Sequence, residues 1–325
     1  MGLSTIKVMH YGIPKPLIDA GISSHFMPIR INHETDFSSL SSHDAQEIRA
    51  VAAGGGHDPI DANMFDKLPN LEIVASFGVG YDHIDAVEAA RRGILVTNTP
   101  DVLTDDVADL AVTLLLQAVR QTGKAERFLR TGSWNKGAFP LTQSLRDRKV
   151  GILGLGRIGR AIARRLDSFG VSIGYCGRTQ QVDVGYTYYP DIAAMAGAVD
   201  TIIVAAPGGA STHHLIDAAV LGLLGPDGIV INVGRGSVID EAALARALGD
   251  GVIAAAGLDV YEHEPGVHPA LLAAENAILL PHIGSASHRT RNAMAQLVVD
   301  NLVAWFSGKG PLTPVPETPF APNPR

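Results

Sequence analysis

Cysteine is almost absent from the 325-residue sequence, in which Cys176 is the only one. An internal disulfide is therefore excluded, and a reducing compartment, the cytoplasm, is the expected location. The sequence also has no excess of positive charge, because 26 Lys and Arg residues are outnumbered by 33 Asp and Glu residues, giving a net charge of −7. With no long basic run, nucleic acid is not an expected partner.

Long hydrophobic runs are missing as well. The most apolar stretch begins at Val107, contains Asp109, and is shorter than the ~20 residues that a membrane-spanning helix needs. The first residues also lack the charged and apolar segments of a signal peptide. We therefore expect a soluble cytoplasmic protein without a membrane partner.

What the sequence does contain is a regular alternation of short apolar runs and helical patterns, which is typical of parallel strands joined by helices. One set of candidate strands begins at Ile6, Ala50, Leu71 and Ile94. A second set begins at Lys149, Val171, Thr201, Gly228, Ala254 and Ala277. Two sets of strands predict two sheets, and hence an α/β protein with two doubly wound, Rossmann-like domains.

Two helical patterns mark the passage between these domains. Apolar residues recur at helical spacing from Asp105 to Gly132, which predicts one long helix crossing from one domain to the other. A second helix, beginning near His288, returns the chain to the first domain. The predicted domains are therefore residues 1–100 with 288–325, and residues 101–287. The tail from Pro311 is rich in proline, which favours an extended or mobile end.

A glycine-rich turn in the second domain predicts a dinucleotide site. Gly154, Gly156 and Gly159 form G-x-G-x-x-G between a strand and a helix that starts near Ile158. The first glycine allows the tight turn, the second lets the backbone approach a pyrophosphate, and the third permits close helix packing. The helix start also offers N–H groups to the phosphates. An ordinary turn has the same glycines, but the flanking strands and helix favour dinucleotide binding.

The next strand ends at Cys176, where a dinucleotide site for NAD places an Asp or Glu against the ribose hydroxyls. A neutral residue there removes the repulsion that a carboxylate exerts on the 2′-phosphate of NADP. Arg178 can make two parallel hydrogen bonds to a phosphate, and Thr179 can add a hydroxyl donor. NADP(H) is therefore the expected cofactor, in preference to NAD(H). The alternative for Arg178 is a solvated loop arginine.

Groups capable of carbonyl chemistry follow the other strands of this domain, where ligands of doubly wound sheets bind. Arg235 carries a permanent planar cation suited to a carboxylate or a polarised carbonyl. His282 is the side chain best suited to exchange a proton near neutral pH. Glu264 lies between the strands that carry Asp259 and His282, so it can reach the imidazole and favour its charged form. Each residue taken alone also fits a structural role.

The stretches "LEIVASFGVGYDHID", "GILGLGRIGRAIARRL", "INVGRGSVIDEAALARAL", "AGLDVYEHEP" and "LLPHIGSAS" together resemble the D-isomer-specific 2-hydroxyacid dehydrogenase family over nearly the entire chain. The resemblance implies a flavodoxin-like substrate domain made from both chain ends, an inserted NAD(P)-binding Rossmann domain and a cleft between them. It also implies a homodimer, built largely through the nucleotide-binding domains. "CGRT", at Cys176 to Thr179, resembles the NADPH-using reductases of the family.

The resemblance implies roles for residues in both domains. Arg235 binds and polarises the substrate, His282 is the acid/base and Glu264 pairs with His282. Val79 and Gly80 bind the substrate carboxylate together with Arg235, and His282 is a further substrate contact. Glycines at a strand end also suit an anion-binding nest of N–H groups. No metal is expected. The expected cofactor contacts are Thr104, Gly154, Gly156, Arg157, Ile158, Gly159, Arg178, Thr179, Pro207, Val233, Arg235, Asp259 and His282.

The predicted reaction is reduction of a small 2-oxoacid, with glyoxylate and hydroxypyruvate as leading candidates. Hydroxyphenylpyruvate reduction stays open, because the width of the pocket is not visible in a sequence. A dinucleotide-sensing protein that resembles corepressors of this fold is a second alternative, and formate or phosphite oxidation is a third. The segment around Trp134 resembles one that reaches the partner subunit's active site in relatives, although a core or surface role fits Trp134 as well.

Overall fold

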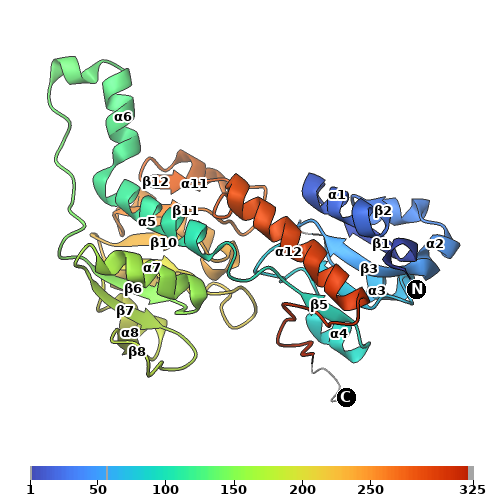
Figure 1. Cartoon of the computed structure of the whole chain (residues 1–325). Helices are drawn as coiled ribbons and strands as arrows, with labels where there is room; N and C mark the ends of the chain where they lie inside the picture. Colours follow the sequence, from blue (N-terminus) through green and yellow to red (C-terminus); the bar gives the residue numbers. More distant parts are fainter. Residues whose placement is uncertain (1, 56–57, 321–325) are drawn as a thin grey trace. The chain divides into compact units, whose positions relative to one another are not determined.

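The computed structural model describes residues 2–55 and 58–320 and divides the chain into two compact units. Unit 1 is Met1–Leu103 with Ser287–Arg325, and unit 2 is Thr104–Ala286. The chain thus passes between units within a few residues of the predicted positions, 100 and 288. Each unit has a parallel sheet with helices on its faces, as the ribbon shows (Figure 1). Among the described residues, no helix combines the length and apolar character required to cross a bilayer.

Unit 1 contains a five-stranded sheet in the order β2-β1-β3-β4-β5, with every pairing parallel. The strands are β1 (Lys7–Tyr11), β2 (Met27–Ile31), β3 (Ile48–Ala53), β4 (Ile73–Ser76) and β5 (Leu95–Thr97). The helices are α1 (Pro16–His25), α2 (Ser42–Glu47), α3 (Ala62–Lys67), α4 (Ala86–Arg91) and α12 (His288–Phe306). The inner strands are almost entirely buried, which is why β4 and most of β3 read as apolar runs.

The edges of this sheet depart from the sequence-based expectation. The edge strand β2 was missed, because its sequence MPIRI is only partly buried and contains Pro28, and proline is confined to edge strands and bulges within sheets. At the opposite edge, residues 311–320 of the proline-rich tail contain bends, a turn and one bridge to β5 rather than a uniformly extended segment, and residues 321–325 lie outside the described residues. Thr97 and Pro314 form an antiparallel bridge, and the Val315 N–H donates to the carbonyl of Val96.

Unit 2 contains a seven-stranded parallel sheet in the order β12-β11-β10-β9-β6-β7-β8. The strands are β6 (Lys149–Leu153), β7 (Ser172–Cys176), β8 (Thr187–Tyr189), β9 (Thr201–Val204), β10 (Ile229–Asn232), β11 (Ala255–Leu258) and β12 (Ala277–Leu279). The helices are α5 (Thr104–Arg120), α6 (Thr122–Arg130), α7 (Arg157–Asp167), α8 (Ile192–Ala196), α9 (Ala218–Leu224), α10 (Glu241–Gly249) and α11 (Pro269–Ala273). The chain order reverses between β6 and β9, which is where doubly wound sheets bind ligands.

The prediction of one long helix from Asp105 to Gly132 was wrong. The helix breaks at Gln121, which has a left-handed conformation with φ 49° and separates α5 from α6. Both helices belong to unit 2, so neither carries the chain across from unit 1. α5 buries an apolar face against α7 and the strands β10, β11 and β12. α6 has no buried residue, and Figure 1 shows it standing away from the rest of unit 2.

Candidate active site

The glycine turn after β6 has the three properties that the motif predicts. Gly154 has φ +94°, and a Cβ placed there lies 2.9 Å from the backbone of Ala206, so the position excludes other residues. A Cβ on Gly159 lies 2.1 Å from the carbonyl oxygen of Gly154, which shows how closely α7 approaches the turn. By contrast, a Cβ on Gly156 meets nothing within 4 Å.

This arrangement fits a bound pyrophosphate. Gly156 is exposed and immediately precedes α7, so its open side leaves room for phosphates beside the backbone. Arg157 and Ile158 are the first two residues of α7, where N–H groups have no partner within the helix. The residues of the turn therefore match the shape and charge of a dinucleotide pyrophosphate.

The end of β7 lacks an acid, as predicted. Cys176 is buried, and burial raises the pKa of its thiol, so it contributes no negative charge. Arg178 and Thr179 follow it and are both exposed. The residues that directly follow Cys176 thus present a cation and a hydroxyl, while a carboxylate that acts on the Cys176 thiol, Asp191, comes from the start of α8.

A network that the sequence did not reveal ties the segment after β7 to α7. The Arg160 guanidinium donates to both carboxylate oxygens of Asp183 at 2.8 Å and also bonds the Gln181 side chain. Gln181 is held further by its side-chain amide, which donates to the Leu155 carbonyl at 2.9 Å, and by its N–H, which donates to the Tyr175 hydroxyl at 2.7 Å. The segment that carries Arg178 and Thr179 is therefore anchored at its far end.

Arg235 lies after β10 in a segment fixed by Asn232, which is almost fully buried. The Asn232 side chain donates to the Arg235 carbonyl at 2.9 Å and accepts from the Gly234 N–H at 3.0 Å. The Arg235 guanidinium donates to the Gly234 carbonyl at 2.8 Å. Arg235 is half-buried and directly precedes a short 3-10 turn (Gly236–Val238), so the backbone that presents the cation is held by hydrogen bonds to Asn232 and by this turn.

The structure places Glu264 beside His282. An oxygen of the Glu264 carboxylate lies 2.5 Å from Nδ1 of the His282 imidazole. The other oxygen accepts the Tyr261 N–H at 3.0 Å, which fixes the carboxylate. The Glu264 side chain is only 13% exposed, whereas that of His282 is 49% exposed. A carboxylate that is held in the protein therefore orients an accessible imidazole.

Asp259 holds the backbone on the other side of His282. Its carboxylate accepts the Ile283 N–H at 2.7 Å and the Gly284 N–H at 2.8 Å. Burial raises the pKa of Asp259, an effect opposed by these two hydrogen bonds and by the nearby His282. His282 itself has φ 51°, an unusual backbone conformation for a side chain of this size. The position of the imidazole is thus determined from both flanks.

Packing brings the Arg235 segment next to the Glu264 and His282 pair. Gly236, which follows Arg235, packs so tightly that a Cβ would lie 1.8 Å from the carbonyl carbon of Tyr261. The Tyr261 N–H is the group bonded to Glu264. Of the other predicted contacts, Val233 is buried after β10, Pro207 is exposed after β9, and Thr104 is the first residue of α5.

In unit 1, the turn after β4 carries the predicted carboxylate-binding amides. The carbonyls of Gly78 and Val79 accept hydrogen bonds from the Thr99 N–H and the Asn98 side chain, both at 2.8 Å. Within residues 2–55 and 58–320, the N–H groups of Val79 and Gly80 donate no hydrogen bond. The carbonyls are therefore bonded to the protein, and the N–H groups stay available to an anion.

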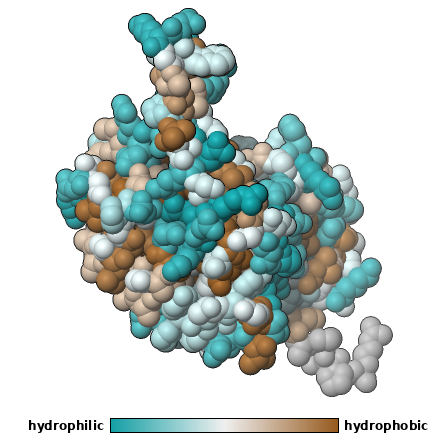
Figure 2. Space-filling view, turned by 90° about the vertical axis from the view of Figure 1, so that its left-hand side faces the viewer, coloured by the Kyte–Doolittle hydropathy of each residue, from teal (hydrophilic) through white to brown (hydrophobic). Residues whose placement is uncertain are grey.

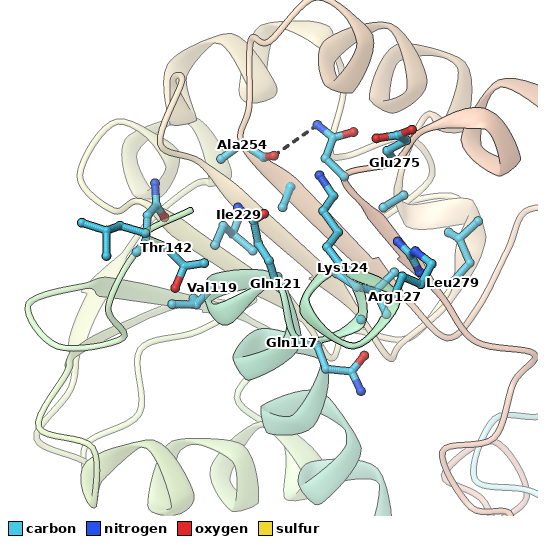
Figure 3. A pocket seen from close by; sticks show the side chains of 18 residues that line it. Gln117, Val119, Gln121, Lys124, Arg127, Thr142, Ile229, Ala254, Glu275 and Leu279 are labelled. Carbon is cyan, nitrogen blue, oxygen red and sulfur yellow. Dashed lines mark hydrogen bonds between the residues drawn. The ribbon is translucent and has the colours of Figure 1, made fainter. Parts of the chain in front are cut away.

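A cavity of about 620 Å³ lies elsewhere in unit 2. Figure 3 shows Lys124 and Arg127 of α6 on one side of it, with Ile229 and Ala254, at the starts of β10 and β11, on another. It therefore adjoins the amino ends of strands whose carboxyl ends carry Arg235 and Asp259. None of the predicted catalytic residues lines it.

The comparisons with known proteins identify the family. The model of the D-isomer specific 2-hydroxyacid dehydrogenase NAD binding domain matches residues 112–284. The chain belongs to the D-isomer specific 2-hydroxyacid dehydrogenase family. This family consists of NAD(P)-dependent enzymes, so the α/β fold with two parallel sheets and the turn at Gly154 are those of a dehydrogenase.

Several relatives resemble most of the chain. It is 47% identical over 294 residues to glyoxylate/hydroxypyruvate reductase A of Arabidopsis thaliana, covering 90% of this chain and 94% of the relative. It is 46% identical over 282 residues to hydroxyphenylpyruvate reductase of Plectranthus scutellarioides, covering 87% and 89%. A solved NADPH-dependent glyoxylate/hydroxypyruvate reductase of Sinorhizobium meliloti, in complex with NADP and malonate, superposes with a TM-score of 0.92 at 52% identity over 98% of both chains.

Proposed function

We propose that this dehydrogenase uses NADPH to reduce a small 2-oxoacid, glyoxylate or hydroxypyruvate, to the D-2-hydroxyacid. The observation that carries the proposal is the 2.5 Å pair of Glu264 and His282, connected by packing to the segment of Arg235. A proton donor and a permanent cation at the carboxyl edge of a dinucleotide-type sheet are what carbonyl reduction needs.

The cofactor would be held at the carboxyl ends of the unit 2 strands. The N–H groups at the start of α7, with Gly154, Gly156, Arg157, Ile158 and Gly159, suit its pyrophosphate, and Arg178 and Thr179 suit a 2′-phosphate. Thr104, Pro207, Val233, Arg235, Asp259 and His282 are the contacts that we propose for its remaining parts. When bound, the dinucleotide supplies the hydride, and the protein supplies alignment and electrostatics.

The chain's own residues then have distinct tasks. Because Nδ1 of His282 is bonded to Glu264, Nε2 is the nitrogen that holds the proton to be transferred to the carbonyl oxygen. Glu264 fixes the orientation of the imidazole through its contact with Nδ1. Arg235 stabilises the negative charge that develops on that oxygen. The Val79 and Gly80 N–H groups, with Arg235, bind the carboxylate of the 2-oxoacid.

The choice of substrate and cofactor is supported by the relatives. The Arabidopsis relative is named as a glyoxylate/hydroxypyruvate reductase, and the Sinorhizobium structure as an NADPH-dependent enzyme of the same kind. The exposed Arg178 and the buried neutral Cys176 of this chain support the same cofactor. Hydroxyphenylpyruvate is the second candidate, because a relative that is 46% identical is named as its reductase.

Steady-state rates decide between these substrates. Glyoxylate, hydroxypyruvate, pyruvate and hydroxyphenylpyruvate are each assayed with NADPH and with NADH, and the largest kcat/KM is expected for glyoxylate or hydroxypyruvate with NADPH. Arg178→Ala is expected to raise the KM for NADPH at least tenfold more than the KM for NADH. Equal losses for both cofactors contradict the assignment of the 2′-phosphate. Cofactor binding without turnover of any 2-oxoacid favours the sensing protein instead.

We also propose a cytoplasmic homodimer assembled through unit 2. The support is the segment of α6 and the loop after it, where Leu129, Trp134 and Leu141 are 54%, 66% and 100% exposed. Figure 2 shows this segment as a projection with hydrophobic surface near its base. A second copy that covers these side chains removes them from water, and Trp134 is then able to reach the partner's active site. Light scattering on the wild type and on Leu129→Lys tests the dimer, with Val87→Lys in unit 1 as control.

A further inference from the structure

The cavity of about 620 Å³ in unit 2 has positively charged groups on one side. Lys124 and Arg127 are three residues apart in α6, so they lie on one face of this helix, and Figure 3 shows both beside the cavity. In the part of the chain that the structure describes, neither side chain forms an ion pair or a hydrogen bond. Arg120 adds a third cation nearby, because it donates to the hydroxyl of Thr142, another residue of the lining, at 3.2 Å. This side of the cavity is therefore suited to an anion.

Another side of the cavity is apolar. Ile229, Ala255 and Ala277 are the first residues of β10, β11 and β12, and they line the cavity together with Ala254 and Val119. Alanine side chains project little from the backbone, so this floor accepts a flat apolar group. Cavities of about 300–1,000 Å³ are the usual size of sites for small organic molecules. The space therefore fits an organic anion better than a hydrated inorganic ion.

Two further polar side chains narrow the class of ligand. Glu275 lines the cavity, and Figure 3 shows it across from Arg127. Gln121, at the break between α5 and α6, lines it as well. Neither side chain bonds to another described residue. A carboxylate accepts hydrogen bonds from ribose hydroxyls, and an amide side chain offers a donor and an acceptor to the edge of a base. A phosphate, a ribose and a base thus each have complementary groups in the lining.

The cavity is separate from the proposed catalytic residues. β10 begins at the cavity with Ile229, and its four residues span about 13 Å before the chain continues to Arg235. α5 likewise lines the cavity near its end, at Val119, and its 17 residues place Thr104, a proposed cofactor contact, about 25 Å away. Of the three side chains assigned to the dimer contact, only Leu141 lines the cavity. A ligand in the cavity therefore leaves the cofactor site open.

We propose that this cavity is a second ligand site, which binds a nucleoside monophosphate. The phosphate accepts hydrogen bonds from Lys124 and Arg127, the base lies on the alanine floor, and the ribose hydroxyls donate to Glu275. The planar fork of an arginine and the ammonium group of a lysine together match the oxygens of a phosphate monoester. The site takes no part in hydride transfer, and it does not depend on which 2-oxoacid the enzyme reduces.

Isothermal titration calorimetry with AMP tests the site. The protein is first saturated with NADP and NAD, so that the cofactor site is occupied. AMP is expected to bind, while adenosine, which lacks the phosphate, is expected to bind at least about tenfold more weakly. Lys124→Met is expected to weaken AMP binding by at least about tenfold for the same reason. Arg130→Met is the matched control, because Arg130 belongs to α6, does not line the cavity and pairs with Glu126 at 2.7 Å. It is expected to bind AMP as the wild type does.

The inference is overturned if the saturated wild type binds no AMP, if it binds AMP and adenosine equally, or if Lys124→Met binds AMP as the wild type does. Equal losses in Lys124→Met and Arg130→Met also overturn it, because they assign the effect to α6 as a whole. Since α6 has no buried residue, Lys124→Met is expected to fold and to keep the turnover of the wild type. The comparison of AMP with adenosine needs no variant. AMP binding by a protein that reduces no 2-oxoacid supports this site and overturns the proposed function alone.

Discussion

The Glu264 carboxylate lies 2.5 Å from Nδ1 of His282, eighteen residues further along the chain. In the proposed mechanism this contact leaves Nε2 as the nitrogen that transfers the proton, because Nδ1 is already bonded. His282→Ala is therefore expected to lower kcat by ~10²–10⁴-fold, the usual contribution of a general acid. The NADPH dissociation constant, measured by fluorescence titration, is expected to change less than threefold.

The control for this prediction is His288→Ala, which removes an exposed imidazole at the start of α12. Its turnover is expected to match the wild type. Glu264→Gln and Glu262→Gln form a second matched pair for the turnover measurement. Glu262→Gln serves as the control, because Glu262 also pairs with a histidine, His214. Turnover that survives in His282→Ala contradicts its role as proton donor.

The glycines of the turn after β6 are expected to respond differently to the same substitution. Gly156→Ala adds a methyl group that meets nothing within 4 Å in the protein itself, so the free energy of unfolding is expected to stay close to that of the wild type. NADPH binding is expected to weaken at least tenfold, because the methyl group enters the space proposed for the pyrophosphate.

Gly159→Ala forces a Cβ to within 2.1 Å of the Gly154 carbonyl oxygen, and overpacking of this kind costs about 1–3 kcal/mol or more. Its melting temperature is therefore expected to fall even without cofactor. Thermal unfolding and cofactor titration of both variants separate the two effects. A Gly156→Ala variant that binds NADPH normally argues against the pyrophosphate site.

Arg160 is expected to govern cofactor discrimination without contacting the cofactor. Arg160→Met releases Asp183 and Gln181, and so loosens the segment that carries Arg178 and Thr179. We expect the KM for NADPH to rise about fivefold more than the KM for NADH. Arg164→Met, an exposed arginine one turn later in α7, is the matched control. Equal changes in the KM for NADPH and the KM for NADH would mean that Arg160 only stabilises the fold.

Because His10 is buried, the folded protein is expected to lose stability in acid. His10 is 1% exposed, and burial lowers its pKa below 6.5, while Asp19 opposes this and Arg30 and Lys15 reinforce it. A histidine whose folded pKa is depressed stabilises the protein above pH 6.5, and this contribution is lost as the pH falls through the folded pKa. The wild type is expected to lose more stability between pH 7.5 and pH 5 than His10→Asn.

Denaturant unfolding at both pH values measures this difference. The variant is expected to be less stable at pH 7.5 by about 1–3 kcal/mol, because a buried hydrogen bond is rearranged. Its decline towards pH 5 is expected to be shallower. Identical declines in the two proteins contradict a depressed His10 pKa.

The sequence was sufficient to predict strands and candidate site residues where the local pattern and the chemistry of the residues agree. Buried parallel strands produce apolar runs, so β6, β9 and β10 were located correctly, and the residues that follow them were found with them. Glu264 was placed near His282 because both lie beyond the ends of neighbouring strands. The turn at Gly154 was recognised because its spacing occurs between a strand and a helix.

Other features depend on contacts that no local pattern records. The break at Gln121 interrupts a helical period that continues on both sides, so only backbone geometry reveals it. Arg160 is one of several arginines in α7, and its partner Asp183 lies 23 residues away. Lys15 and Arg291 both lie over the Phe77 ring only because α12 packs against α1 and β4 within unit 1. Pairings of this kind are products of tertiary structure.

The residues that follow α12 protect the sheet of unit 1. Val96, in the edge strand β5, donates its N–H to the Thr318 hydroxyl, and its carbonyl accepts the Val315 N–H. An uncovered edge of this kind pairs readily with strands of other molecules. We therefore expect truncation before Pro314 to promote aggregation, although it removes no catalytic group. For the same reason, an affinity tag belongs after Phe320 rather than in place of this segment.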